Sequence, residues 1–185
     1  MKRYVAFLRA INVGGHAVVK MDDLRDTFIG AGCRKVRTYI QSGNVVFELL
    51  ERDPARVLRI VRVRLGKVLG DEPEILFREV RDIEGIVRRD PFKDFGGERD
   101  IKLYVAFLSR KPKERPRFPL VSPKEALEAV AMRDREVFIV SRRKKNGFYG
   151  FPNNFIEKEL GVSATSRNWS TVTKIVEFVR QGADD

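Results

Sequence analysis

The 185-residue chain carries a formal net charge of +11, and 43% of its residues are hydrophobic, which is enough for a buried core in one domain or two small ones. No apolar stretch approaches the roughly 20 residues that span a bilayer, the run after Arg3 is too short for a signal peptide, and the single Cys33 excludes a disulfide framework. We therefore expect a cytoplasmic protein without a membrane partner, and the charge favours an anionic partner unless it reflects genome composition or heat adaptation.

The first predicted strand, residues 3–10, contains the segment Tyr4–Leu8, which recurs in the same order as Tyr104–Leu108. A repeat of this kind indicates an internal duplication when the elements after each copy also correspond. Both copies are unbroken apolar runs, whereas a strand with one wet face alternates apolar and polar residues. The pattern predicts two strands that are each buried on both faces.

The first half of the chain has the element order of a ferredoxin-like unit, βαββαβ. The elements that follow the first strand are a glycine-containing loop at 11–16, a helix at 21–31, strands at 36–41 and 44–49 joined at Ser42-Gly43, a helix at 54–69 and a strand at 74–80. Asp53-Pro54 opens the second helix as N-cap and first helical residue. Its inward face is predicted to consist of Val57, Leu58, Val61, Leu65 and Val68.

The second half is predicted to repeat this order after a connecting segment, 81–100, that contains a short helix. A basic, proline-rich loop at 110–117 follows the repeated strand, and Ser122-Pro123-Lys124-Glu125 has the pattern of a capping box that begins a helix. The remaining elements are a hairpin within 129–140, a helix after Pro152, a strand at 164–167 and a last helix. A turn signal at Asn146-Gly147 leaves the pairing of the strands between 129 and 151 open.

The predicted fold class is therefore α+β, with two ferredoxin-like (βαββαβ) repeats, residues 1–80 and 101–185. We expect them to pack as one compact unit with their apolar sheet faces turned toward each other. A C-terminal helix is additional to the second repeat.

Polar residues at the ends of predicted elements are candidates for an anion site. Asn12, Gly14 and Gly15 follow the first strand, where backbone N–H groups can hold an anion. Lys20 stands at a helix start, where a cation is unfavourable beside the dipole. A plain glycine turn is the alternative, because the spacing is not that of a known phosphate loop.

Two further segments contain candidate ligand-binding residues. Gln41, Ser42 and Asn44 surround the first hairpin turn, which needs no functional explanation. Arg167 and Asn168 precede the last helix, where Asn168 can cap the helix and Arg167 can bind an anion.

No catalytic group is identifiable, so whether the protein is an enzyme stays open. His16 is the only histidine, and no acidic cluster has metal-ligand spacing, so we expect neither a metal nor a cofactor. Cys33 has no histidine near it in sequence and is interpreted as an inert thiol. Candidate phosphate contacts are provided by two basic segments, which otherwise form solvated faces: Arg56, Arg59, Arg64 and Lys67, and Arg142, Arg143, Lys144 and Lys145.

Three blocks of the chain together resemble the DUF1697 family of small bacterial proteins. They are residues 7–15 with 19–24, residues 38–47, and residues 151–172. Ala10 departs from the glycine usual at that position, so a close backbone approach there is not implied. The resemblance implies two ferredoxin-like repeats and no particular reaction. Its signature residues in this chain are mostly polar and lie at element ends, which favours one shared site formed by the segments 9–20, 41–44 and 165–171.

The leading functional hypothesis is a non-catalytic binding protein for an anionic ligand, with nucleic acid first because of the charge. Base stacking on an open sheet is not expected, since the third strands lack the glycine-aromatic motif of RNA-recognition modules. One alternative is a small-molecule binding protein or enzyme that recognises phosphate or carboxylate through the three polar segments. Another is a protein-interaction or homodimer module, so a homo-oligomer is left open.

Overall fold

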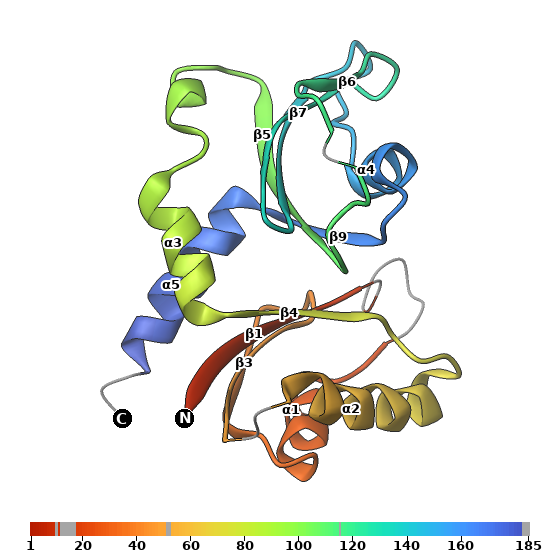
Figure 1. Cartoon of the computed structure of the whole chain (residues 1–185), viewed down its shortest axis with the longest axis vertical. Helices are drawn as coiled ribbons and strands as arrows, with labels where there is room; N and C mark the ends of the chain where they lie inside the picture. Colours follow the sequence, from red (N-terminus) through yellow and green to blue (C-terminus); the bar gives the residue numbers. More distant parts are fainter. Residues whose placement is uncertain (10, 12–17, 51–52, 115, 183–185) are drawn as a thin grey trace. The chain divides into compact units, whose positions relative to one another are not determined.

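The computed structural model describes residues 1–9, 11, 18–50, 53–114 and 116–182, which form nine strands, five α-helices and one 3-10 helix (Figure 1). The chain divides into two units: unit 1 contains residues 1–85 and 178–185, and unit 2 contains residues 86–177. Each unit contains one antiparallel sheet, so the fold is of the predicted α+β class.

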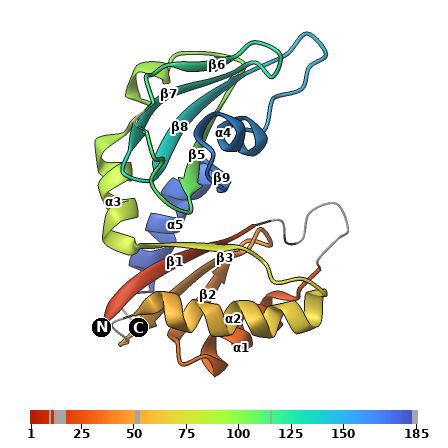
Figure 2. The ribbon, with the colours of Figure 1, turned by 45° about the vertical axis from the view of Figure 1, so that its right-hand side comes forward.

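Unit 1 has a four-stranded sheet with two helices on one face (Figure 2). The strand order is β2-β3-β1-β4. The elements are β1 (Lys2–Leu8), α1 (Met21–Gly30), β2 (Arg34–Tyr39), β3 (Asn44–Leu49), α2 (Pro54–Leu69) and β4 (Ile75–Glu79).

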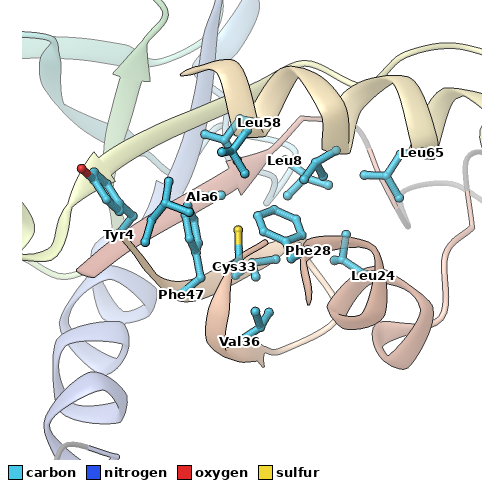
Figure 3. Packing of buried hydrophobic residues seen from close by; sticks show 14 of the residues in the cluster. Tyr4, Ala6, Leu8, Leu24, Phe28, Cys33, Val36, Phe47, Leu58 and Leu65 are labelled. Carbon is cyan, nitrogen blue, oxygen red and sulfur yellow. The ribbon is translucent and has the colours of Figure 1, made fainter. Parts of the chain in front are cut away.

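The centre of this sheet is β1, which pairs with β3 on one side and β4 on the other. Tyr4, Ala6 and Leu8 face the helices and belong to the core cluster (Figure 3). Val5 and Phe7 point to the opposite face and are also fully buried. The prediction that this strand is buried on both faces is therefore confirmed, and an unbroken apolar run is what such a position requires.

Unit 2 has a five-stranded sheet in the order β6-β7-β8-β5-β9. Its strands and α4 are β5 (Ile101–Leu108), β6 (Leu120–Ser122), β7 (Leu127–Arg133), β8 (Glu136–Arg142), α4 (Asn153–Leu160) and β9 (Ala164–Asn168). The chain also forms α3 (Val80–Arg89), the 3-10 helix η1 (Lys93–Phe95) and α5 (Trp169–Gln181). The division between the units falls after Gly85 in α3 and after Glu177 in α5.

The central strand β5 also has its Tyr104–Leu108 segment buried on both faces. Tyr104, Ala106 and Leu108 form a core with Phe155 and Ile156 of α4. On the other face, Phe138 lies opposite Val105 in the neighbouring strand and packs edge-on against Phe92, with ring centroids 5.9 Å apart. Two different sets of side chains therefore cover the two faces of this sheet.

Helix α2 begins where the sequence predicts, because the Asp53 side chain accepts hydrogen bonds from the backbone N–H groups of Ala55 and Arg56. Four of the five predicted inward residues, Val57, Leu58, Val61 and Leu65, are buried. The prediction for Val68 is wrong, because its side chain is 73% exposed. The buried stripe continues from Leu65 to the partly buried Leu69 one turn later, which leaves Val68 beyond its edge.

The helix predicted at Ser122-Pro123-Lys124-Glu125 is absent, and the first helix of unit 1 has no counterpart here. These residues end β6 and form a turn in which Ala126 has a φ of 53°. The next buried residues, Leu127 and Ala129, alternate with less buried ones as in a strand. A capping box begins a helix when apolar residues with helical spacing follow it, whereas the apolar residues that follow here alternate with a period of two.

The pairing left open between 129 and 151 is resolved by the sheet. β7 and β8 form a hairpin around Asp134, and a further bridge joins Arg143 to Tyr149 around Asn146-Gly147. The signal at Asn146-Gly147 therefore marks a second turn, after the β7–β8 hairpin.

The thiol of Cys33 lies in the core of unit 1 (Figure 3), and burial raises its pKa to about 11. We expect a thiol reagent at pH 8 to modify the native protein slowly and the denatured protein at once, because the thiolate is the reactive form. Because folding raises the pKa of the Cys33 thiol, the free energy of unfolding should decrease as the pH rises from about 9 through 11. Rapid modification of native protein at pH 8 would contradict this burial.

Candidate functional site

Three of the candidate anion-binding residues, Asn12, Gly14 and Gly15 in the loop after β1, lie outside the described residues. Lys20 is exposed at the N-cap position of α1 and makes no side-chain capping hydrogen bond. The first turn of this helix contains Asp22 and Asp23. Their carboxylates already complement the positive end of the helix dipole, which reduces its attraction for a bound anion.

Arg9, at the end of β1, makes an internal ion pair. Its Nη1 lies 3.3 Å from Oε2 of Glu74, and its backbone N–H donates to the carbonyl of Glu74. The side chain is half-buried. An anionic ligand at Arg9 would have to share the guanidinium with this carboxylate.

The hairpin between β2 and β3 brings two of the predicted ligand residues together. Asn44 is fully buried, and its Nδ2 donates to the Tyr39 carbonyl and to Oγ of Ser42, at 3.1 and 2.8 Å. Gln41 is exposed at the turn. These contacts close the hairpin from within, as expected of a buried amide that must satisfy its hydrogen bonds.

Arg167 lies in β9, directly opposite Val105 of the central strand. Its guanidinium is buried and donates from Nη1 to Oγ1 of Thr165 and to the carbonyl of Ser166, at 2.9 and 3.0 Å. Burial lowers its pKa to about 10, so the group is still a cation at neutral pH. Asn168, the next residue, is exposed at the end of the strand.

Ion pairs occupy most of the basic run at the end of β8. Arg142 contacts Glu98 and Glu128, Arg143 Nη1 lies 3.3 Å from Asp100, and Lys144 Nζ lies 2.7 Å from Glu125. Lys145 alone of the four has no ion pair within the described part of the chain. The run therefore contributes much less net positive potential than its sequence indicates.

Four of the five cations of α2 differ from that run, while the fifth, Arg62, pairs with Glu72. Arg56, Arg59, Arg64 and Lys67 are exposed, and none forms an ion pair with another described residue. Ile60 and Val63, each 41% exposed, lie on the same outward side of the helix. The helix thus combines a buried apolar face with an outward basic face.

Arg64 of α2 also contacts the end of the neighbouring helix α1. A Cβ placed on Gly30 would lie 2.7 Å from Nη1 of Arg64, so the guanidinium lies against the last residue of α1. A cation at this helix end is favoured by the dipole. Arg56, Arg59 and Lys67 are exposed on α2 without such a contact to a described glycine.

Sequence reasoning does not identify two features that the structure reveals. Unit 1 has a hollow of about 250 Å³ whose lining includes Arg3, Lys35 and Arg37. The Arg37 guanidinium donates to the Phe178 carbonyl at 2.7 Å, so it also caps the end of α5. The second feature is a pair of exposed rings, Phe148 and Phe151, directly after the basic run. The sequence could have indicated these rings, because Phe148 and Phe151 closely follow the turn signal Asn146-Gly147.

In the part of the chain that the structure describes, no helix is both long and apolar enough to cross a bilayer. That same part of the chain contains no cluster of three or more histidine, cysteine or carboxylate side chains that could hold a metal ion.

Comparison with known proteins gives a family match and a similar fold. A family model described as "Protein of unknown function (DUF1697)" matches residues 1–138. Among solved structures, the conserved bacterial protein SP0830 from Streptococcus pneumoniae is similar, with a TM-score of 0.62, 20% identity, and coverage of 95% of this chain and 97% of that chain. At this identity the likeness extends to the fold alone. A comparison with curated proteins found no match.

The burial of Arg167 yields a stability prediction for two variants. Arg167→Ala should lower the free energy of unfolding by about 2–4 kcal/mol, because it leaves a void and removes the donor to Thr165 and Ser166. Arg167→Met keeps most of the volume and removes a charge that burial disfavours, so we expect it to cost less than half as much. Urea unfolding measures both. Equal losses would mean that the charge and hydrogen bonds of the guanidinium, and not the volume of the side chain, stabilise the fold.

Proposed function

Because the chain belongs to the DUF1697 family, whose description assigns no function, we propose from the geometry that it is a non-catalytic nucleic-acid-binding protein. The observation that carries the proposal is the outward face of α2, where Arg56, Arg59 and Lys67 are exposed and make no ion pair with another described residue. The net charge of +11 supports it.

The spacing of these cations suits a phosphate backbone. At a helical rise of about 1.5 Å per residue, Arg56 and Lys67 are about 16 Å apart along the axis, a distance that covers several phosphates. The neighbouring helix α1 carries the exposed acids Asp22, Asp23 and Asp26, so the basic face ends at α2. Contacts of this kind position a nucleic acid without reading its sequence.

The paired run at 142–145 is the weaker candidate for phosphate contacts. Exposed ion pairs are worth little individually, so a phosphate could displace their carboxylates. The displaced carboxylates of Glu98, Asp100 and Glu125 would then repel the same phosphates. Arg56, Arg59 and Lys67 of α2 have no ion-paired carboxylate among the described residues that a phosphate would have to displace.

We predict that Arg56→Ala/Arg59→Ala/Lys67→Ala weakens binding of both RNA and DNA and flattens its salt dependence. Three lost phosphate contacts should reduce the slope of log K against log salt by about 2–3. Alanine favours helices, so the fold should persist. Fluorescence anisotropy at several salt concentrations measures the slope.

The matched control removes the same charge elsewhere, with Lys93→Ala/Lys158→Ala/Lys174→Ala. These exposed lysines of unit 2 also have no ion pair with another described residue. The control should change the slope by less than about one. Equal effects of the two variants would show that only net charge matters, and no binding by the wild type at low salt would reject the function.

A second candidate function, binding of a small phosphate- or carboxylate-bearing ligand, is favoured by one observation, the buried cation of Arg167 beside the hydroxyl of Thr165. The measurement is the melting temperature in rising inorganic phosphate, compared with chloride of equal ionic strength. A specific site predicts a saturable rise that Arg167→Met abolishes. A rise that the variant retains would place the anion elsewhere.

The ferredoxin-like duplication remains part of the proposal. Without β6, the strand order of unit 2 is β7-β8-β5-β9, which corresponds to β2-β3-β1-β4 in unit 1. Arg78 lies opposite Val5, and Arg167 lies opposite Val105, which is the residue that corresponds to Val5 in the second copy of the repeated segment. A helix begins two residues after each arginine, at Val80 and Trp169. This correspondence of register favours a duplicated unit in which a strand replaced one helix.

A further inference from the structure

Residues 143–151, which we call the aromatic arm, connect β8 to α4 and expose two large rings. Phe148 is 71% exposed and Phe151 is 57% exposed. Single exposed apolar residues are common on protein surfaces and need no explanation. Two phenylalanines within four positions, beside a lysine and a tyrosine, form a more unusual combination.

The turn of the arm is held by hydrogen bonds within it. Lys144 N–H donates to the Phe148 carbonyl at 2.8 Å, and Gly147 N–H donates to the Lys144 carbonyl at 2.9 Å. Phe148 N–H donates to Oδ1 of Asn146 at 3.1 Å. Gly147 has a φ of 83°, which favours glycine. Phe148 is therefore displayed from an ordered turn, and binding to it would require little further ordering.

The base of the arm is fixed to the sheet at Gly150. Its carbonyl accepts a hydrogen bond from the buried Oγ of Ser141 at 3.0 Å. A Cβ at this position would overlap the carbonyl oxygen of Glu125 and approach Cγ of Leu127 to 3.0 Å. Lys144 also joins Glu125 through its 2.7 Å ion pair. The absence of a side chain at Gly150 thus lets the arm lie directly on the turn before β7.

Strand β5 supports the two ring-bearing residues that follow Phe148. The Phe151 ring meets the Tyr104 ring edge-on, with centroids 5.7 Å apart. Nζ of Lys102 lies 4.6 Å from the centroid of the Tyr149 ring. Phe151 thus contacts the sheet through Tyr104 while more than half of its surface stays exposed. Such a ring can stack with a planar group from solvent.

The free charge around these rings is positive. Lys102, Lys124 and Lys145 are exposed and have no ion pair with another described residue, whereas the acids Asp100 and Glu125 are already paired with Arg143 and Lys144. A partner that fits this surface has flat apolar faces and negative charges between them. Nucleobases linked by phosphates have this chemistry.

We propose that the aromatic arm is a stacking site for unpaired bases, so that the protein prefers single-stranded to double-stranded nucleic acid. This inference rests on the proposed nucleic-acid binding and specifies its ligand. Phe148 and Phe151 each offer a face to a base, and Lys102 and Lys145 contact the intervening phosphates. Bases within a duplex are stacked on each other and cannot use the rings, so duplex binding depends on charge alone.

The test compares a single-stranded oligonucleotide of about 12 nucleotides with a duplex of the same length, by fluorescence anisotropy at low salt. Phe148→Ser and Phe148→Ser/Phe151→Ser are compared with the wild type. We expect each ring to contribute about fivefold to a hundredfold to single-strand binding, so the double variant should bind the single strand at least about 25-fold more weakly and the duplex unchanged. Phe148 is mostly exposed, so the single variant should keep the wild-type melting temperature and still weaken single-strand binding.

The matched control is Val121→Ser, which removes an apolar side chain of 57% exposure from β6 in the same unit. It should leave both affinities unchanged. Gly150→Ala keeps both rings but displaces the arm from Glu125, so it should weaken single-strand binding as well.

Three results would overturn the inference, and they have different consequences. If the wild type binds both oligonucleotides and the serine variants match it, the arm is not a stacking site, while binding through α2 stands. If the wild type binds neither, the proposed function fails together with this inference. If the rings instead govern binding to phosphatidylcholine–phosphatidylserine vesicles and not to the single strand, the arm is a membrane contact.

Discussion

Burial of both faces of the central strands is the constraint on which the rest of the structure depends. Tyr4–Leu8 and Tyr104–Leu108 have no exposed face, and each strand is paired along both edges. A polar group beside them must therefore be satisfied inside the protein, as Asn44 is by its hairpin and Arg167 by Thr165 and Ser166. Chemistry that needs access to solvent is left to the helix surfaces and to the segments that leave the sheets.

The pairing of surface charges decides how the excess of basic residues is used. In unit 2, carboxylates of Glu98, Asp100 and Glu125 hold the end of β8 and the base of the aromatic arm. Each such pair adds little stability at the surface. Their effect is to orient the chain while cancelling its charge locally. On α2, Arg62 pairs with Glu72, whereas Arg56, Arg59, Arg64 and Lys67 form no ion pair with another described residue, so the same residue types have different consequences in the two places.

Local patterns predicted most of the elements. Asp53-Pro54 and the spacing of Val57, Val61 and Leu65 define α2, since capping and helical periodicity operate within a few residues. The same reasoning fails at Ser122-Pro123-Lys124-Glu125, where a capping pattern was outweighed by pairing of the following residues with β8. Glu125 instead contacts Lys144, nineteen positions away. Propensity is a weak guide where tertiary pairing competes with it.

The sequence by itself determined the α+β class, the two central strands and the family, because the repeated apolar run and the polar blocks are contiguous in the chain. Only the tertiary structure decided which cations are free. Arg142 meets Glu98 across 44 positions and Lys144 meets Glu125 across 19, and no local pattern encodes such distances. The exposure of Phe148 and Phe151 was decided in the same way, because whether an aromatic ring is buried depends on what the fold brings against it.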